Sequence, residues 1–183
     1  MACKTEGRVH QALCSQEMNA VRLEPLSPEH FELVARWLSN GSVNQWLSGD
    51  WRGKETTATI IAIAHRNRRN RFFLVYRQDV PCGFVALSDI EATDNTAMIW
   101  YFLGDNSLSG KGIMSEAVRQ LVKHAFTSLG LRSVYAWAVE TNAASVKLLN
   151  KCGFRVVGRI RKSACFGSQQ LDRIYFDIVA HDC

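Results

Sequence analysis

The chain has 183 residues, of which 47% are hydrophobic and 21% are charged, a composition typical of one globular domain with a full apolar core. No run approaches the roughly 18 apolar residues of a membrane helix, and no signal peptide precedes the domain, so a cytoplasmic protein without a membrane partner is expected. The net charge of +5 suits a phosphate-rich ligand or an acidic partner. No nucleic acid partner is expected, because the basic residues follow no nucleic-acid-binding motif.

The six cysteines are scattered along the chain, at positions 3, 14, 82, 152, 165 and 183. They lack the spacing of a zinc site and have no histidine pair beside them. Neither a metal site nor a disulfide framework is therefore predicted, and the thiols are expected to be reduced.

The N-terminal third begins with residues 1–19, which show no hydrophobic period and are expected to form a flexible tail before a folded domain at 20–183. Val21, Leu23 and Leu26 alternate with polar residues and predict a strand. Ser27 and Pro28 then predict the start of a helix. Its apolar side would consist of Phe31, Val34, Ala35 and Leu38.

The segment Ser39–Gly53 is predicted to be a loop, and it carries Trp46 and Trp51. These tryptophans either pack in the core or wall a groove for a substrate. A second helix is predicted at Lys54–Asn67. The basic run His65–Arg71 is either a solvated helix end, where cations complement the helix dipole, or a phosphate contact.

The middle of the chain predicts three strands, Phe72–Tyr76, Gly83–Leu87 and Ala97–Leu103. The segment Asp105–Ala117 then forms a glycine-bearing loop that opens into a long amphipathic helix. The glycines can take positive φ, and the first N–H groups of a helix have no partner inside it. This stretch therefore predicts an anion site, although its spacing matches neither the dinucleotide pattern nor the P-loop.

The C-terminal part predicts a strand at Ser133–Val139, a capped helix within Glu140–Phe154, and a hairpin of Arg155–Lys162 with Leu171–Val179. The element order predicts a single α/β domain with a mixed, mostly antiparallel central sheet flanked by helices.

Three of these segments resemble the GNAT superfamily of acetyl-CoA-dependent N-acetyltransferases, and most closely its RimJ and RimL type. The resemblance lies in Gly-x-Gly-Ile-Met at Gly110–Met114, in Asn-x-x-Ser at Asn142–Ser145, and in the terminal hairpin. It implies a splayed strand pair in the sheet, acetyl-CoA as co-substrate, no metal, and direct transfer of an acetyl group to a primary amine. Ser109 departs from the family pattern, which has Gln or Arg there, and Met114 replaces Gly or Ala.

The resemblance also implies which residues bind acetyl-CoA. Phe102, Leu103 and Gly104 would present backbone groups to the pantetheine arm at the splay. Asn142 would bond the same arm, although it could simply cap its helix. The pyrophosphate would lie on the loop, where Lys111 is either a screening charge or an exposed lysine. The loop residues are Ser109, Gly110, Lys111, Gly112, Ile113, Met114 and Ser115.

The chemistry implied by the resemblance makes Ser145 the candidate acid, placed near the thioester sulfur. Leu149 stands where many relatives have a tyrosine, and Met98 where many have a glutamate. The base is therefore unassigned. Glu140 is the best remaining carboxylate, followed by Asp89 and Glu91, and a solvated surface carboxylate is the alternative for each.

The acceptor is expected in a groove formed by three irregular segments: the loop with Trp46 and Trp51, the stretch Ser88–Asn95, and the hairpin near Phe166. Four carboxylates there would suit a cationic amine, namely Asp50, Asp89, Glu91 and Asp94. The acceptor is then a protein N-terminus or a small-molecule amine. Alternative acceptors are a nucleotide-linked amino sugar, an aminoglycoside or a polyamine. A second alternative is a non-catalytic acyl-CoA-binding module. The protein could also form a homodimer.

Overall fold

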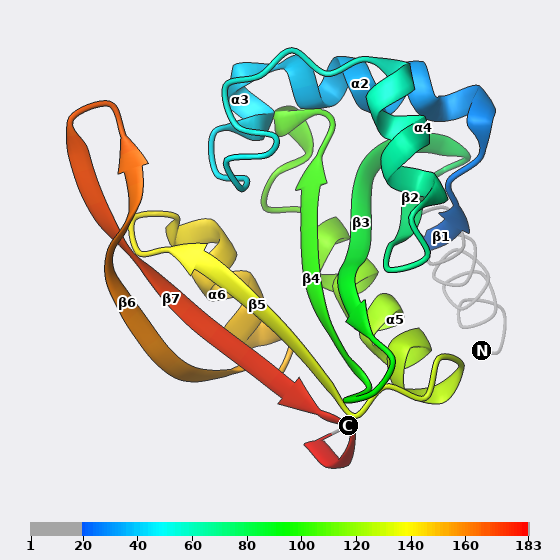
Figure 1. The fold of residues 1–183 in the computed structure, drawn as a ribbon. Helices are drawn as coiled ribbons and strands as arrows, with labels where there is room; N and C mark the ends of the chain where they lie inside the picture. The colour runs from blue at the N-terminus through cyan, green and yellow to red at the C-terminus, as the bar shows by residue number, and fades with distance from the viewer. Residues whose placement is uncertain (1–19, 183) are drawn as a thin grey trace, which may run out of the picture.

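A computed structural model describes residues 20–182, so the tail predicted at 1–19 lies outside the described residues. The described chain forms one seven-stranded sheet with the strand order β1-β2-β3-β4-β5-β7-β6 (Figure 1). Only the β4–β5 pair is parallel, and every other neighbouring pair is antiparallel. The predicted α/β class with a mixed, mostly antiparallel sheet is therefore confirmed.

Before the glycine loop, one strand is followed by helices of a single layer and then by three consecutive strands. These elements are β1 (Val21–Pro25), α2 (Phe31–Ser39), α3 (Gly41–Asn44), α4 (Ala58–Arg66), β2 (Arg71–Arg77), β3 (Val80–Glu91) and β4 (Thr96–Leu103). Several bounds differ from the sequence prediction, among them that of β3, which is longer than the predicted Gly83–Leu87, and two of the differences arise from side-chain caps. The helix predicted from Lys54 begins only after Thr57, whose hydroxyl caps it by accepting from the Ile60 N–H at 3.4 Å. The predicted loop at Ser39–Gly53 contains α3, which Asn40 caps by accepting from the Ser42 N–H.

The elements after the glycine loop are α5 (Ile113–Thr127), β5 (Ser133–Val139), α6 (Ala143–Lys151), β6 (Arg155–Phe166) and β7 (Gln169–Val179). Short 3-10 helices lie at Pro28–His30, Asn106–Leu108 and Ala180–Asp182. None of the helices between residues 20 and 182 has the length and hydropathy of a membrane span.

Helices lie on both faces of the sheet (Figure 1), and a hydrophobic core lies between the sheet and each helical layer. One core lies under α5 and α6 and includes Ala97 and Ile99 of β4. The other lies under α2 and α4, and Phe102 of β4 belongs to it, with Trp100 packed against it. Because successive side chains of a strand point to opposite faces, β4 contributes to both cores.

The parallel strands β4 and β5 pair over a short stretch only, from Thr96–Met98 to Ser133–Tyr135. Beyond it they diverge, as Figure 1 shows, and within the described chain no residue of β4 after Met98 is paired with β5. Unpaired backbone groups at a strand edge can pair with an extended ligand as if it were an added strand. The opening lies in the middle of the sheet, between its two helical layers.

Candidate active site

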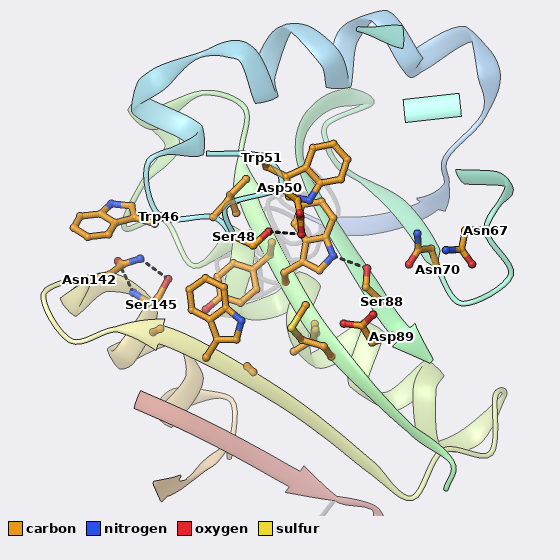
Figure 2. Close-up of a pocket in the computed structure, with 18 residues that line it drawn as sticks. Trp46, Ser48, Asp50, Trp51, Asn67, Asn70, Ser88, Asp89, Asn142 and Ser145 are labelled. Carbon is orange, nitrogen blue, oxygen red and sulfur yellow. Dashed lines mark hydrogen bonds between the residues drawn. The ribbon is translucent and has the colours of Figure 1, made fainter. Parts of the chain in front are cut away.

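A cavity of about 310 Å³ lies where β4 and β5 diverge (Figure 2). Its walls come from the loop after α3, the end of β3, the diverging strands and the start of α6. Asn142 and Ser145 lie at one end, and Ser88 and Asp89 lie at the other (Figure 2). A volume of this size is at the lower end of the range for small-molecule sites.

The α6 end of the cavity is built by a side-chain cap. The Asn142 Oδ1 accepts from the Ser145 N–H at 3.2 Å, and the Asn142 Nδ2 donates to the Ser145 Oγ at 3.1 Å. Asn142 therefore caps the helix and lines the cavity at once, so the two readings of its role are compatible. Because the Ser145 oxygen already accepts a hydrogen bond, its proton is oriented to donate elsewhere.

Tyr101 also lines this part of the cavity, although no sequence motif pointed to it. Its hydroxyl oxygen is buried and has no hydrogen-bond partner among the described residues. Burial raises the pKa of Tyr101 far above its ordinary value, and the Ser145 hydroxyl, which approaches the phenol without meeting hydrogen-bond geometry, lowers that pKa in part. The phenol is therefore a neutral donor. The signal in the sequence is the strand alternation, which puts Tyr101 on the same side of β4 as Ile99, facing α5 and α6.

The aromatic wall of the cavity includes both tryptophans of the predicted groove. Trp51 stacks on Trp100 with ring centroids 5.7 Å apart, and the Trp100 Nε1 donates to the Ser88 Oγ at 2.8 Å. Trp46 lies against Phe166 of the hairpin at 5.2 Å. Trp51 thus packs against the core and lines the cavity, while Trp46 joins the loop to the hairpin. Trp100 and Trp137, which also line the cavity, were not singled out from the sequence.

Two carboxylates of the predicted groove, Asp50 and Asp89, line the cavity. The register of β3 shifts between Ser88 and Glu91, and Asp89 has a φ of 52°. A bulge of this kind changes where a side chain points, which explains how the consecutive residues Ser88 and Asp89 both reach the cavity. Glu91 does not line it, because its carboxylate pairs with Arg69 at 3.6 Å and accepts from the Thr93 N–H.

Glu140 lies at the end of β5 but is not among the residues that line the cavity. Its Oε1 accepts from the Asp172 N–H at 3.0 Å, and its Oε2 lies 3.4 Å from the Arg159 Nη2. Arg159 also pairs with Asp172 at 3.3 Å. These contacts tie the end of β5 to the hairpin and commit the Glu140 carboxylate to partners within the protein.

The glycine loop has the geometry of a phosphate cradle. Gly110 and Gly112 have φ values of 78° and 79°, and a Cβ at either position would meet no atom within 4 Å. The helix α5 starts directly after Gly112, and the first N–H groups of a helix have no partner inside it. Asp105 fixes the loop by accepting from the Ser107 hydroxyl and N–H, which holds the pKa of Asp105 below its usual range. Ser109 and Lys111 lie in the same loop, and Lys111 is exposed.

The three expected pantetheine contacts, two at the end of β4 and one directly after it, differ in which backbone groups they leave unpaired. The Gly104 N–H donates to the Cys82 carbonyl at 3.0 Å, and a Cβ on Gly104 would lie 2.2 Å from Cε2 of Trp37. The glycine is therefore required by Trp37, and its N–H is already used. Phe102 is buried and Leu103 is half-buried, and their strand edge toward β5 is open.

Met98 and Leu149, the two positions at which the resembled family often has an acid or a base, carry no ionisable group. Met98 lines the cavity, so the position where relatives have a glutamate does face the cavity but carries a thioether. Leu149, where relatives have a tyrosine, is only 1% exposed. Among residues 20–182, no group of three or more His, Cys, Asp and Glu side chains is arranged to hold a metal ion.

Comparisons with known proteins agree on one family. A family model described as an acetyltransferase (GNAT) domain matches residues 20–155. The "Uncharacterized N-acetyltransferase p20" of Bacillus licheniformis is 32% identical over 114 residues, which are 62% of this chain and 64% of that relative. The ribosomal-protein-serine acetyltransferase of Escherichia coli K12 is 26% identical over 81% of this chain and 84% of its own.

A similar fold is found among solved structures. The crystal structure of a spermidine N-acetyltransferase from Vibrio cholerae in complex with CoA and spermine superposes with a TM-score of 0.80 and 17% identity. The superposition covers 88% of this chain and 96% of that one.

Proposed function

Since this chain belongs to the GNAT acetyltransferase family, we propose that it transfers the acetyl group of acetyl-CoA directly to an aliphatic primary amine that binds as a cation. One observation carries the proposal. A single cavity joins the opened edge of β4, with Asn142 and Ser145 beside it, to an aromatic wall that holds Asp50 and Asp89. The donor and the acceptor can therefore meet inside the sheet from opposite faces.

The chain's own residues fit acetyl-CoA. The N–H groups of Gly112–Ser115 would hold the pyrophosphate at the positive end of the α5 dipole. The open edge of β4 and the Asn142 side chain would align the pantetheine arm. When bound, acetyl-CoA supplies the acetyl group as a thioester, whose carbon–sulfur bond breaks as the amine nitrogen bonds to the carbonyl carbon.

The same residues lower the barrier mainly by alignment, because holding two reactants in a reactive geometry removes much of the entropy cost of their encounter. The Ser145 hydroxyl would donate to the developing thiolate. A hydrogen bond to a charged acceptor is stronger than one to a neutral acceptor, so this contact gains strength as the reaction proceeds. The amine must lose one proton before attack and a second afterwards. Because Met98 offers no carboxylate to accept them, both protons would be released to water at the cavity mouth.

The acceptor class follows from the charges in the cavity. Asp50 and Asp89 lie apart along it, with Asp50 between the Ser145 end and Asp89 (Figure 2). Tryptophan faces and carboxylates both attract ammonium groups. Two separated carboxylates favour an acceptor with a second positive charge away from the reacting nitrogen, which is the chemistry of a polyamine.

A protein N-terminus is the second candidate, and a different observation favours it. The arginine-rich run from Arg66 to Arg71 is exposed beside Asn67 and Asn70, which line the cavity. Exposed cations at this rim would repel the far end of a long polyamine and would attract an acidic peptide. The ribosomal-protein-serine acetyltransferase is among the relatives of this chain.

The test is thiol release from acetyl-CoA with matched acceptors. Spermidine, a monoamine of equal length, and peptides with acidic or basic residues after a free N-terminus are compared at equal concentration. Each product is identified by mass spectrometry. A kcat/KM for spermidine well above that of the monoamine supports the polyamine, and preference for acidic peptides supports the second candidate.

The control reaction uses peptides whose N-terminus is already acetylated. No thiol release with any amine, although acetyl-CoA binds, would instead support a non-catalytic acyl-CoA-binding module and refute the proposed reaction.

A further inference from the structure

The Tyr101 hydroxyl is buried at the functional cavity and has no hydrogen-bond partner among the described residues. Most buried polar groups in proteins are paired, because a buried group without a partner has lost its hydrogen bonds to water without replacement. An unpaired hydroxyl inside a binding cavity therefore indicates a partner that arrives with the ligand.

Tyr101 lies on the side of the cavity where the helix α6 begins. It packs against the hydrophobic core that contains Leu149 of α6 and Cys152, which follows that helix. Leu149 carries no polar group, so this helix position offers no donor to a ligand in the cavity. The phenol comes from β4, the strand whose open edge faces the splay.

The Asn142–Ser145 pair at the start of α6 provides a second hydrogen-bond donor, the Ser145 hydroxyl. The Asn142 Nδ2 donates to the Ser145 Oγ, so the serine hydroxyl still has its own proton to donate to a ligand. Serine and tyrosine hydroxyls then line the same end of the cavity, each with a proton to donate. Two donors at one point suit an acceptor with several lone pairs, and a thiolate sulfur is such an acceptor.

We propose that the Tyr101 hydroxyl donates a hydrogen bond to the sulfur that leaves the thioester, and so supplies from β4 the donor that α6 lacks at Leu149. The inference rests on the proposed function, since it requires the thioester to occupy the splay. As the carbon–sulfur bond breaks, its electron pair moves onto sulfur, and the phenol stabilises that charge while keeping its own proton. The sulfur is finally protonated from water.

The phenol is suited to this role because it stays neutral. Burial raises its pKa above the ordinary value of about 10, so the hydroxyl keeps its proton at neutral and mildly alkaline pH. Because this hydroxyl has no hydrogen-bond partner among the described residues, its removal should not lower the free energy of unfolding. Removal of a hydroxyl with a structural role would lower it.

The experiment compares wild type, Tyr101→Phe and the control Tyr135→Phe. Tyr135 lies on the neighbouring strand β5, burial also raises its pKa, and it does not line the cavity. Three quantities are measured: kcat at saturating substrates, the midpoint of thermal unfolding, and the pKa of the thiol of bound CoA, followed by the ultraviolet absorbance of the thiolate.

For Tyr101→Phe we expect kcat to fall roughly 10- to 150-fold, the value of one hydrogen bond to a charged group. The pKa of the bound thiol should rise, and the midpoint of unfolding should stay equal or increase. Tyr135→Phe should change neither kcat nor the thiol pKa.

A Tyr101→Phe variant with wild-type kcat and an unchanged thiol pKa overturns the inference while leaving the proposed function intact. A lower unfolding midpoint with unchanged kcat also overturns it, because the hydroxyl would then have a structural partner. If wild type neither binds CoA nor releases thiol, the proposed function fails as well.

Discussion

Replacement of Gly112 by valine tests the phosphate cradle, because this glycine combines a left-handed backbone with open space. Its φ is 79°, and a Cβ would meet no atom within 4 Å. The substitution should therefore lower the free energy of unfolding only through backbone strain, by about 1–3 kcal/mol for a β-branched residue with positive φ. The added methyl groups would enter the open space beside the start of α5, where we propose that the pyrophosphate binds.

Gly130 provides the matched control at the other end of the same helix. It has a φ of 67° and equally open surroundings, and it lies on the far side of α5 from the loop. Gly130→Val should lose a similar free energy of unfolding and bind CoA like wild type. Gly112→Val should weaken CoA binding at least tenfold, which is about 1.4 kcal/mol.

Both effects are measured on the same samples, stability by urea unfolding and affinity by calorimetric titration with CoA. A third variant, Gly104→Ala, should lose stability most, because its Cβ would collide with Trp37. An unchanged dissociation constant for a folded Gly112→Val protein would refute the cradle.

Three further predictions concern the cavity. Ser145→Ala should lower kcat roughly 10-fold or more and leave the dissociation constant of acetyl-CoA nearly unchanged, as titration and steady-state kinetics would reveal; an unaltered kcat would remove Ser145 from the mechanism. Trp46→Ala should raise the KM of the acceptor roughly 2- to 30-fold without changing the KM of acetyl-CoA. Trp51→Ala should do the same and also lower the free energy of unfolding, because Trp51 stacks on Trp100. Loss of stability alone in both variants would place the acceptor elsewhere. Burial raises the pKa of Tyr101 above its value of about 10 in the unfolded chain. The free energy of unfolding of wild type should therefore fall as the pH rises above about 10, and more steeply than that of Tyr101→Phe. Equal pH dependence of the free energy of unfolding in the two proteins between about pH 9 and 11 would contradict the buried phenol.

The sequence predicted the elements because their signals are local. The apolar period of α5, the stop at Gly130 and the alternation in the strands depend on nearby residues only. Bounds were missed where a side-chain cap decided them, as at Thr57 and Asn40. A short helix such as α3 inside a polar loop has too few residues to show a period.

The loop and the α6 cap were found through motifs, whereas the rest of the cavity depends on pairing between distant segments. The divergence of β4 from β5 places Tyr101 and Trp137 in the cavity wall, and no local sequence pattern predicts where two parallel strands stop pairing. The bulge that brings Asp89 into the cavity is equally invisible. Glu140 looked available in the sequence because its partner Arg159 lies on another strand.

The central claim is that the thioester sulfur binds between β4 and β5, beside the hydroxyls of Ser145 and Tyr101. A crystal structure of the protein with acetyl-CoA tests it most directly. The claim predicts the pyrophosphate on the N–H groups of Gly112–Ser115, the pantetheine arm along the open edge of β4, and the sulfur within hydrogen-bonding distance of both hydroxyls. A sulfur outside the splay, with the Tyr101 hydroxyl still unpaired, would contradict it.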